Sequence, residues 1–290
     1  YNSSTPYNQQ WNVFIQRELP MNTLLTVGYV GSRGTHLIGY YDVNTQVPTL
    51  NPNYNFGMQF ATLNAAGGIT NNPRINKNFA QILNQVTDTT SHYHGLQTQI
   101  NKRLSHSVQA QVSYTYSECI DQASGSTGID NNYGFQNPYY RNADTGWCSY
   151  HIRNNFIANG TWVVPFKGNR LVEGWQVSGI LSVYDGQPLG NLFTSVPIAT
   201  VGLNNDRPNY VGSAPGCNNS PVNATPKQGN GVFWINTSCF QLPRVGELGN
   251  AARGIIKGPN FRSLDFSIQK MTKITEKVRS EEHTSELQSH

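Results

Sequence analysis

The sequence predicts an all-β, antiparallel fold whose strands cross a membrane, and three observations support this prediction. Charged residues make up only 12% of the 290 residues and hydrophobic residues 37%, while 27 Gly, 15 Tyr and 15 Pro favour strands and turns over helices. Apolar and uncharged polar residues alternate in several stretches, as they do in strands whose two faces meet different surroundings. Short turns alternate with long polar loops between these stretches. Five Trp and twelve Phe argue against disorder, and no run of about 18 apolar residues provides a transmembrane helix.

The first predicted hairpin joins a strand at residues 7–18 to a strand at residues 23–33. Pro20 and Asn22 mark the tight turn between them. On both strands one face is largely apolar and the other carries mainly Asn, Gln, Thr, Ser or Gly. The apolar face consists of Tyr7, Trp11, Val13 and Ile15 on the first strand and Leu25, Val27 and Tyr29 on the second.

Two further hairpins and a last strand repeat this pattern. The second hairpin joins residues 96–104 to 108–118, the third joins 155–166 to 175–184, and the last strand runs through residues 264–268. A slip of one residue in any pair would turn its Gln and Asn side chains to the apolar side, so the pattern determines the register. The sequence therefore predicts that Trp11, Val112 and Leu181 face lipid.

The connections between these strands differ strongly in length. Residues 19–22, 105–107 and 167–174 form short turns, whereas residues 34–91, 119–150 and 186–260 form long loops. A tilted strand of about ten residues crosses a bilayer, and outer-membrane barrels have short periplasmic turns and long outer loops. These features predict an antiparallel transmembrane β-barrel fragment, the partial, open sheet of a large barrel with long extracellular loops, in the lipid of the cell outer membrane. The alternative is a soluble sandwich, as in a secreted β-rich adhesin or glycan-binding domain.

Five aromatic side chains of the apolar faces lie toward strand ends, where membrane proteins carry aromatic girdles at the lipid–water boundary. They are Trp11, Tyr29, Tyr116, Trp162 and Trp175, and Phe166 lies on the same face at the end of the predicted strand 155–166. We predict that these side chains lie at the membrane interface. In the sandwich alternative the same residues would belong to the core.

The four cysteines fall two to a loop. Cys119 and Cys148 lie in the second long loop, and Cys217 and Cys239 lie in the third. No C-x-x-C spacing indicates a zinc or redox centre, and the oxidising periplasm through which outer-membrane proteins pass favours disulfides. Of the three possible pairings, locality favours Cys119 with Cys148 and Cys217 with Cys239, because a pairing between loops requires distant loop tips to meet.

No catalytic constellation, cofactor motif or metal site emerges from the sequence, which predicts a protein that is not an enzyme. His92-x-His94 is interpreted as part of a solvated strand rather than a pair of metal ligands. Gly28-x-x-Gly31-x-x-Gly34 runs from a strand end into a loop and lacks the helix of a dinucleotide site. The net charge of +4 comes without a Lys/Arg run, so nucleic acid is not an expected partner.

Several segments are similar to one known family. The chain contains, in this order, PYNQQWNVFIQRELP at 6–20, VGYVGSRGTHL at 27–37, YHGLQ at 93–97, VSYTYS at 112–117, GWQVSGI at 174–180 and LDFS at 264–267. In their residues and in their order along the chain, these segments resemble the Oar-like TonB-dependent receptors. The resemblance implies part of a barrel that in the family has about 22 strands around a plug domain. It also implies two partners. One is TonB, which parts of the parent protein outside this chain would contact, and the other is a bulky solute of unknown identity.

The last twelve residues differ from the rest. Residues 279–290 are rich in Glu, His and Ser, lack the alternation found upstream, and resemble the translation of a common sequencing adapter. We therefore expect a barrel domain over residues 1–278, and we expect residues 279–290, as a non-native segment, to be disordered or arbitrarily placed. A sheet with open edges would aggregate rather than insert into a bilayer, because a bilayer leaves no backbone group unpaired.

Overall fold

The computed structural model describes residues 4–124, 135–169, 171–190, 192–194, 206–222, 234–275 and 278–285. Within these residues the chain forms one large antiparallel sheet, three two-stranded sheets and three short 3-10 helices. No helix in the described part of the chain is long and apolar enough to span a membrane.

The large sheet is open, with β1 and β15 at its two edges. In spatial order it contains β1 (Tyr7–Leu19), β2 (Thr23–Asp42), β7 (Leu83–Ser105), β8 (Val108–Asp121), β10 (Asn154–Val163), β11 (Trp175–Tyr184), β14 (Phe261–Thr275) and β15 (Val278–Ser285), and β9 (Gly146–Trp147) pairs with β8. The small sheets join β3 (Thr49–Leu50) to β4 (Met58–Gln59), β5 (Ala61–Leu63) to β6 (Ile69–Asn71), and β12 (Asn209–Tyr210) to β13 (Phe240–Gln241). The 3-10 helices are η1 (Asn55–Gly57), η2 (Arg141–Asp144) and η3 (Thr237–Cys239).

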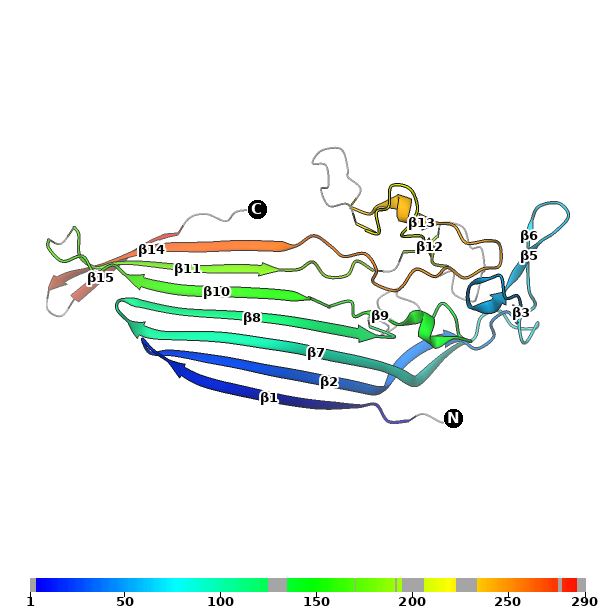
Figure 1. Cartoon of the computed structure of the whole chain (residues 1–290), viewed down its shortest axis with the longest axis horizontal. Helices are drawn as coiled ribbons and strands as arrows, with labels where there is room; N and C mark the ends of the chain where they lie inside the picture. Colours follow the sequence, from blue (N-terminus) through cyan, green and yellow to red (C-terminus); the bar gives the residue numbers. More distant parts are fainter. Residues whose placement is uncertain are drawn as a thin grey trace.

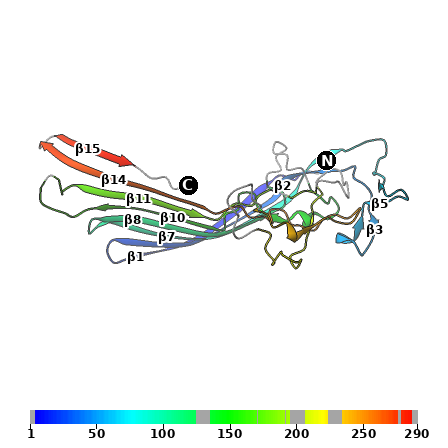
Figure 2. The same cartoon turned by 90° about the horizontal axis from the view of Figure 1, so that it is seen from above.

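The three predicted hairpins are confirmed. β1 pairs with β2, β7 with β8, and β10 with β11, each antiparallel. In Figure 1 the turns of these hairpins lie together on the left, and the long connections lie together on the right; Figure 2 shows the same division from above. We call these the turn end and the loop end of the sheet. All long connections therefore meet on one side, as the alternation of loop lengths predicts.

The register gives the sheet one apolar and one polar face, because directly opposed residues of paired strands share a face. The row through Val112 consists of Arg17, Leu25, Ile100, Val112, Ala158, Leu181 and Leu264. The adjacent row on the other face consists of Gln16, Thr26, Gln99, Ser113, Ile157, Ser182 and Ser263. Trp11 lies six positions from Arg17 on β1, so Trp11, Val112 and Leu181 share the apolar face, as expected.

Two glycines of the Gly28-x-x-Gly31 pattern leave room for aromatic rings. Gly31 lies directly opposite Trp11, and Gly28 lies directly opposite Phe14. A Cβ atom at Gly31 would collide with the Trp11 indole, and one at Gly28 would collide with the Phe14 ring. The glycines therefore serve cross-strand packing, in which a ring covers the backbone of the opposing glycine.

Two tight turns have left-handed backbone at both central residues. These residues are Met21 and Asn22, with φ of 64° and 55°, and His106 and Ser107, with φ of 51° and 65°. A two-residue turn with two positive φ angles matches the right-handed twist of a hairpin. His106 and Ser107 form such a two-residue turn, whereas Pro20, Met21 and Asn22 form a three-residue turn between Leu19 and Thr23, and neither turn contains the glycine that positive φ angles usually favour.

The first long loop begins later than predicted. Residues 34–91 were expected to form a loop, but β2 continues to Asp42 and β7 begins at Leu83, so these strands have 20 and 23 residues rather than about ten. Between Gly34 and Leu37, β2 has one residue more than the facing part of β7. Between the partners of Leu37 and Ile38, β7 in turn has one residue more than β2. The two irregularities compensate each other, so backbone pairing resumes beyond them. In the third hairpin, β10 ends at Val163 instead of residue 166, just before Pro165, which has no backbone N–H to donate.

The chain end also differs from the expectation. Residues 279–285 were expected to be disordered or arbitrarily placed, whereas in the structure β15 (Val278–Ser285) pairs antiparallel with β14. Backbone N–H and C=O groups at a sheet edge pair with an adjoining strand whatever its side chains are, so pairing here does not require the alternation found upstream. Residues 286–290 lie outside the described residues.

Candidate ligand site in the outer loops

The described parts of the three long connections pack against one another, although the sequence analysis predicted them only as long polar loops. We call residues 43–82 loop 1, residues 122–153 loop 2 and residues 185–260 loop 3. Loops 1 and 3 share a small apolar core in which Phe60 and Leu248 are fully buried. The Asn55 amide N–H donates to Glu247 Oε1 at 2.9 Å, and Asn55 Nδ2 donates to Asn209 Oδ1 at 2.7 Å. Asn55 therefore joins loop 1 to loop 3 at two points.

Buried ion pairs connect loop 3 to loop 2 and to the sheet. Arg207 Nη2 lies 2.9 Å from Asp144 Oδ1, and both side chains are almost completely buried. Arg253 of loop 3 pairs with Asp121 at the end of β8, and its Nε donates to the Asp144 carbonyl at 3.1 Å. Paired charges of this kind stabilise a buried site only while both partners are present. The loops therefore form one packed unit, which we call the loop assembly.

Burial changes the protonation equilibria within the loop assembly. It raises the pKa of Asp144, which the Arg207 charge and the Gln136 and Asn137 amides oppose, and it lowers the pKa of Arg207. Burial also lowers the pKa of Arg253 to about 10. Each arginine has an acidic partner, Asp144 for Arg207 and Asp121 for Arg253. Asp144 Oδ2 and Arg207 Nη1 have no hydrogen-bond partner among the described residues.

The loop assembly rests on the polar face of the sheet. Cys119 and Asp121 lie on that face, because they share rows with Gln10 and Asn8 respectively. Cys119 is bonded to Cys148 of loop 2, and Asp121 pairs with Arg253 of loop 3. The loop end of the polar face is therefore partly covered by folded chain.

The structure joins the cysteines as two local pairs. The Cα atoms of Cys119 and Cys148 are 5.5 Å apart, and those of Cys217 and Cys239 are 4.8 Å apart, both within the range that a disulfide spans. All four side chains are buried. The first bridge ties loop 2 to β8, and the second lies wholly within loop 3.

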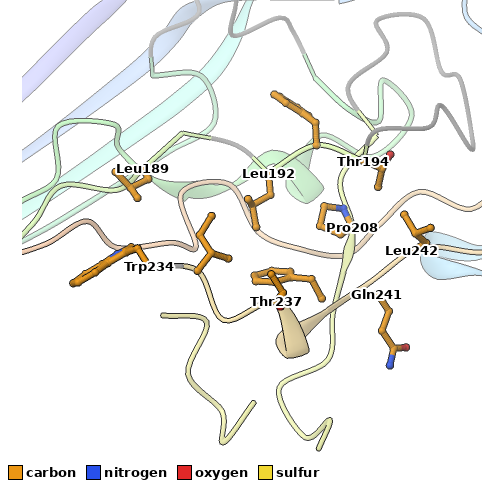
Figure 3. Close-up of a pocket in the computed structure, with 11 residues that line it drawn as sticks. Leu189, Leu192, Thr194, Pro208, Trp234, Thr237, Gln241 and Leu242 are labelled. Atoms are coloured by element: carbon orange, nitrogen blue, oxygen red, sulfur yellow. The ribbon is translucent and has the colours of Figure 1, made fainter. Parts of the chain in front are cut away.

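Loop 3 contains an apolar groove of about 680 Å³, which is within the range of small-molecule sites. Figure 3 shows Trp234 and Leu189 at one end, Leu242 at the other, and Leu192 and Pro208 between them. Its remaining lining residues are Phe193, Thr194, Ile235, Thr237, Phe240 and Gln241. Apolar side chains predominate, and Thr and Gln supply a few polar atoms for orienting a ligand.

Asn236 and the second disulfide hold one wall of the groove. The Asn236 side chain accepts a hydrogen bond from the Ser238 amide and donates to the carbonyls of Gly216, Cys217 and Ser220. This caps η3, from which Thr237 points into the groove, and Cys239 of the same helix is bonded to Cys217. The wall is therefore fixed by covalent and hydrogen bonds, although it belongs to a loop.

The sequence analysis did not identify the groove residues. Their signal was present, since Leu192-Phe193 and Trp234-Ile235 are apolar pairs in a polar loop without strand alternation. The His92 and His94 side chains lie on the apolar face near its loop end and belong to no metal cluster. In the described part of the chain no three His, Cys, Asp or Glu side chains come together as metal ligands.

Comparison with known families assigns the chain to one of them. The profile of the outer membrane beta barrel domain matches residues 1–282, which is nearly the whole chain and extends past residue 278. The chain belongs to this outer membrane β-barrel family. Its place is the outer membrane, so the secreted module that the sequence left open is not supported. No curated protein sequence matches the chain.

One solved structure is similar to this barrel segment. It is the outer membrane transporter YddB from Escherichia coli, with 10% sequence identity and a TM-score of 0.46. The match covers 95% of the present chain and 27% of the YddB chain. The barrel segment therefore spans about a quarter of the length of that transporter.

In a barrel of this family the apolar face is the one that contacts lipid. β10 has ten residues, and at about 3.3 Å per residue and a tilt of about 40° it spans about 25 Å, the height of the apolar band. Trp11, Tyr29 and Tyr116 lie toward the loop end of this face, and Trp162 and Trp175 lie toward its turn end. Their positions suit two girdles, and their contact with the membrane interface stays a prediction.

Proposed function

We propose that the chain is part of an Oar-like TonB-dependent receptor that captures a bulky solute at its outer loops for uptake through the barrel. The observation that carries this proposal is the apolar groove in a loop assembly that disulfides and buried ion pairs hold in one shape. A preformed groove binds without first ordering its loops, which lowers the entropic cost of capture. Such a protein acts by binding and transport rather than by catalysis.

The groove favours a solute with an apolar or aromatic part. Trp234 and Phe240 offer rings for stacking, and Leu192 and Leu242 offer aliphatic surface. Few polar atoms line the groove, so a fully hydroxylated solute such as a free sugar would leave much of the lining unmatched. The open sheet supports the receptor assignment as well, since its edges must pair with further strands to close a barrel.

The experiment compares full-length receptor purified from its own cells with a variant whose groove is filled. Thr237→Arg places a long charged side chain in the groove, and Thr62→Arg, at an exposed position of β5, is the matched control. Small molecules extracted from each protein are identified by mass spectrometry. We expect a compound that is present with wild type and Thr62→Arg and absent with Thr237→Arg.

Uptake of that compound then tests dependence on TonB. Cells lacking TonB and cells lacking the receptor should show the same loss of uptake. If all three proteins retain the same compounds, the groove is not the capture site. If uptake persists without TonB, the receptor is not TonB-dependent.

A further inference from the structure

A basic and aromatic patch lies on the apolar face at its loop end. The strand register brings Arg33 of β2 directly opposite His92 of β7, and His94 lies one row closer to the membrane centre. Trp11 shares the row of His94, since both lie opposite Gly31. We define the headgroup patch as Trp11, Tyr29, Arg33, His36, His92 and His94.

We propose that the headgroup patch binds the phosphate of an anionic lipid in the outer leaflet. Arg33 lies four residues beyond Tyr29 on β2, which is about 13 Å along the strand and about 10 Å in height at a tilt of about 40°. The headgroup layer extends about 5–8 Å beyond the hydrocarbon on each side. The His94 row, about 5 Å above the Tyr29 row, lies within this layer, and Arg33 lies at its outer boundary, within reach of a phosphate through its long side chain. The patch therefore faces headgroups, while the Tyr29 row below it faces the edge of the hydrocarbon.

The side chains of the patch are arranged to receive an anion. Arg33 is exposed, and neither the Arg33 nor the His92 side chain makes a hydrogen bond or ion pair with another described residue. The Arg33 guanidinium has five N–H donors in a planar fork, which fits a phosphate. His36 donates through Nδ1 to the Thr87 carbonyl at 3.2 Å, which leaves its Nε2 without a partner among these contacts.

Aromatic rings frame the cationic groups. His94 stacks on Tyr29 with ring centroids 6.2 Å apart and is hydrogen-bonded to the Tyr29 hydroxyl at 2.6 Å; its ring lies 6.5 Å from Trp11. Tyr7 packs on His36 at 5.8 Å. Glu118, opposite His94, is the one carboxylate directly paired with a patch residue in the described register. The Arg33 guanidinium is therefore the charge that is complementary to an anionic headgroup, the histidines add ring nitrogens that can form hydrogen bonds, and the aromatic rings suit the interface.

The test uses the full-length barrel protein in detergent, mixed with equal amounts of phosphatidylglycerol and phosphatidylethanolamine. Native mass spectrometry counts the lipids that remain bound. We expect wild type to retain phosphatidylglycerol preferentially. The double variant Arg33→Gln/His92→Gln should retain at least fivefold less of it, and Arg33→Lys should retain most of it.

Arg103→Gln is the matched control, because Arg103 lies near the turn end on the polar face and should leave lipid binding unchanged. Heat-modifiable migration on gels verifies that each variant has a folded barrel. Equal binding of both lipids by wild type, or undiminished binding by the folded double variant, would overturn the proposal. Binding of inorganic phosphate at the patch without retention of phosphatidylglycerol would also overturn it, since the site would then serve a free anion.

Discussion

At the scale of single residues, buried ion pairs and polar hydrogen bonds hold the loop assembly together. In most soluble domains a large apolar core has this role. The loop assembly has Phe60 and Leu248 as its fully buried apolar cluster, and much of its interior consists of hydrogen-bonded polar side chains. Polar groups in such surroundings are stable only when each has a partner, so single substitutions there have large effects.

Asp144→Asn should destabilise the loop assembly by about 3–5 kcal/mol, because it leaves the buried Arg207 charge without its carboxylate. The measurement is hydrogen exchange of the Ala143 and Gly249 amides in the full-length protein. The double variant Asp144→Asn/Arg207→Met removes both charges, so its loop assembly should lose less stability than that of Asp144→Asn. Equal exchange rates in wild type and Asp144→Asn would show that the ion pair does not hold loops 2 and 3 together.

Glu247 should make the contact between loops 1 and 3 sensitive to acid. Burial raises the pKa of Glu247, but hydrogen bonds from Arg244 and from the Asn55 amide outweigh it and bring the pKa to about 2. A folded pKa below the ordinary value of 4.5 stabilises the contact above pH 4.5. This stabilisation is lost as the pH falls from 4.5 toward 2.

Pepsin, which is active in this range, measures the change as faster cleavage of loop 1 at lower pH. In Glu247→Gln the cleavage rate, corrected for the pH dependence of pepsin itself, should no longer vary with pH. An unchanged pH profile in Glu247→Gln would mean that another group controls the contact.

At the scale of elements, tight turns and disulfides determine how strands and loops are joined. The turn after β1 places Met21 in the left-handed region, where a side chain costs about 1 kcal/mol relative to glycine. Met21→Gly should therefore stabilise the barrel by up to about 1 kcal/mol, as measured by urea titration of the folded protein in vesicles. Met21→Ala keeps a Cβ atom and is the control. An equal gain in both variants would point to the loss of the exposed Met side chain instead.

The two disulfides should be present in protein isolated from its membrane. Their cysteines are 29 and 22 residues apart, and in the chain-entropy model each closure contributes about 3.5 kcal/mol. Peptide mapping without reductant should find Cys119 linked to Cys148 and Cys217 linked to Cys239. Four alkylatable thiols in the native protein would contradict the pairing.

At the scale of the whole molecule, the two faces of the sheet should respond differently to charge. Leu181→Arg places a charge on the lipid-facing row and should cost about 2–4 kcal/mol in folding into vesicles. Ser182→Arg, one residue later on the polar face, should cost much less. Urea titration of both full-length variants provides the comparison. Similar losses would mean that the polar face does not line a water-filled lumen.

The hairpins could be predicted because their signal is local. Alternation along β8 or β11 depends on neighbouring residues of the same strand, and the register follows from matching two such patterns. The loop assembly could not be predicted in this way, because its contacts join residues distant in sequence; Asn55 and Glu247 are 192 residues apart. The cysteines are an exception, since locality selects their pairing. The groove had a sequence signal in Leu192-Phe193 and Trp234-Ile235, but only the folded loop brings these pairs together.

The polar face has a consequence for anything that moves along it. Apart from Ile157, the row through Ser113 carries amide and hydroxyl side chains. The next row consists of Glu18, Leu24, Asn101, Gln111, Asn159, Ile180 and Asp265, so it adds three amides, two carboxylates and two aliphatic side chains. Each hydrogen bond to such a group has a net worth of about 1 kcal/mol, and a similar partner lies one row further on. A polar segment or solute can therefore exchange one contact for an equivalent one at each step. The free energy of binding therefore varies little along the polar face. A solute that moves along this face meets only low barriers, and no single site retains it.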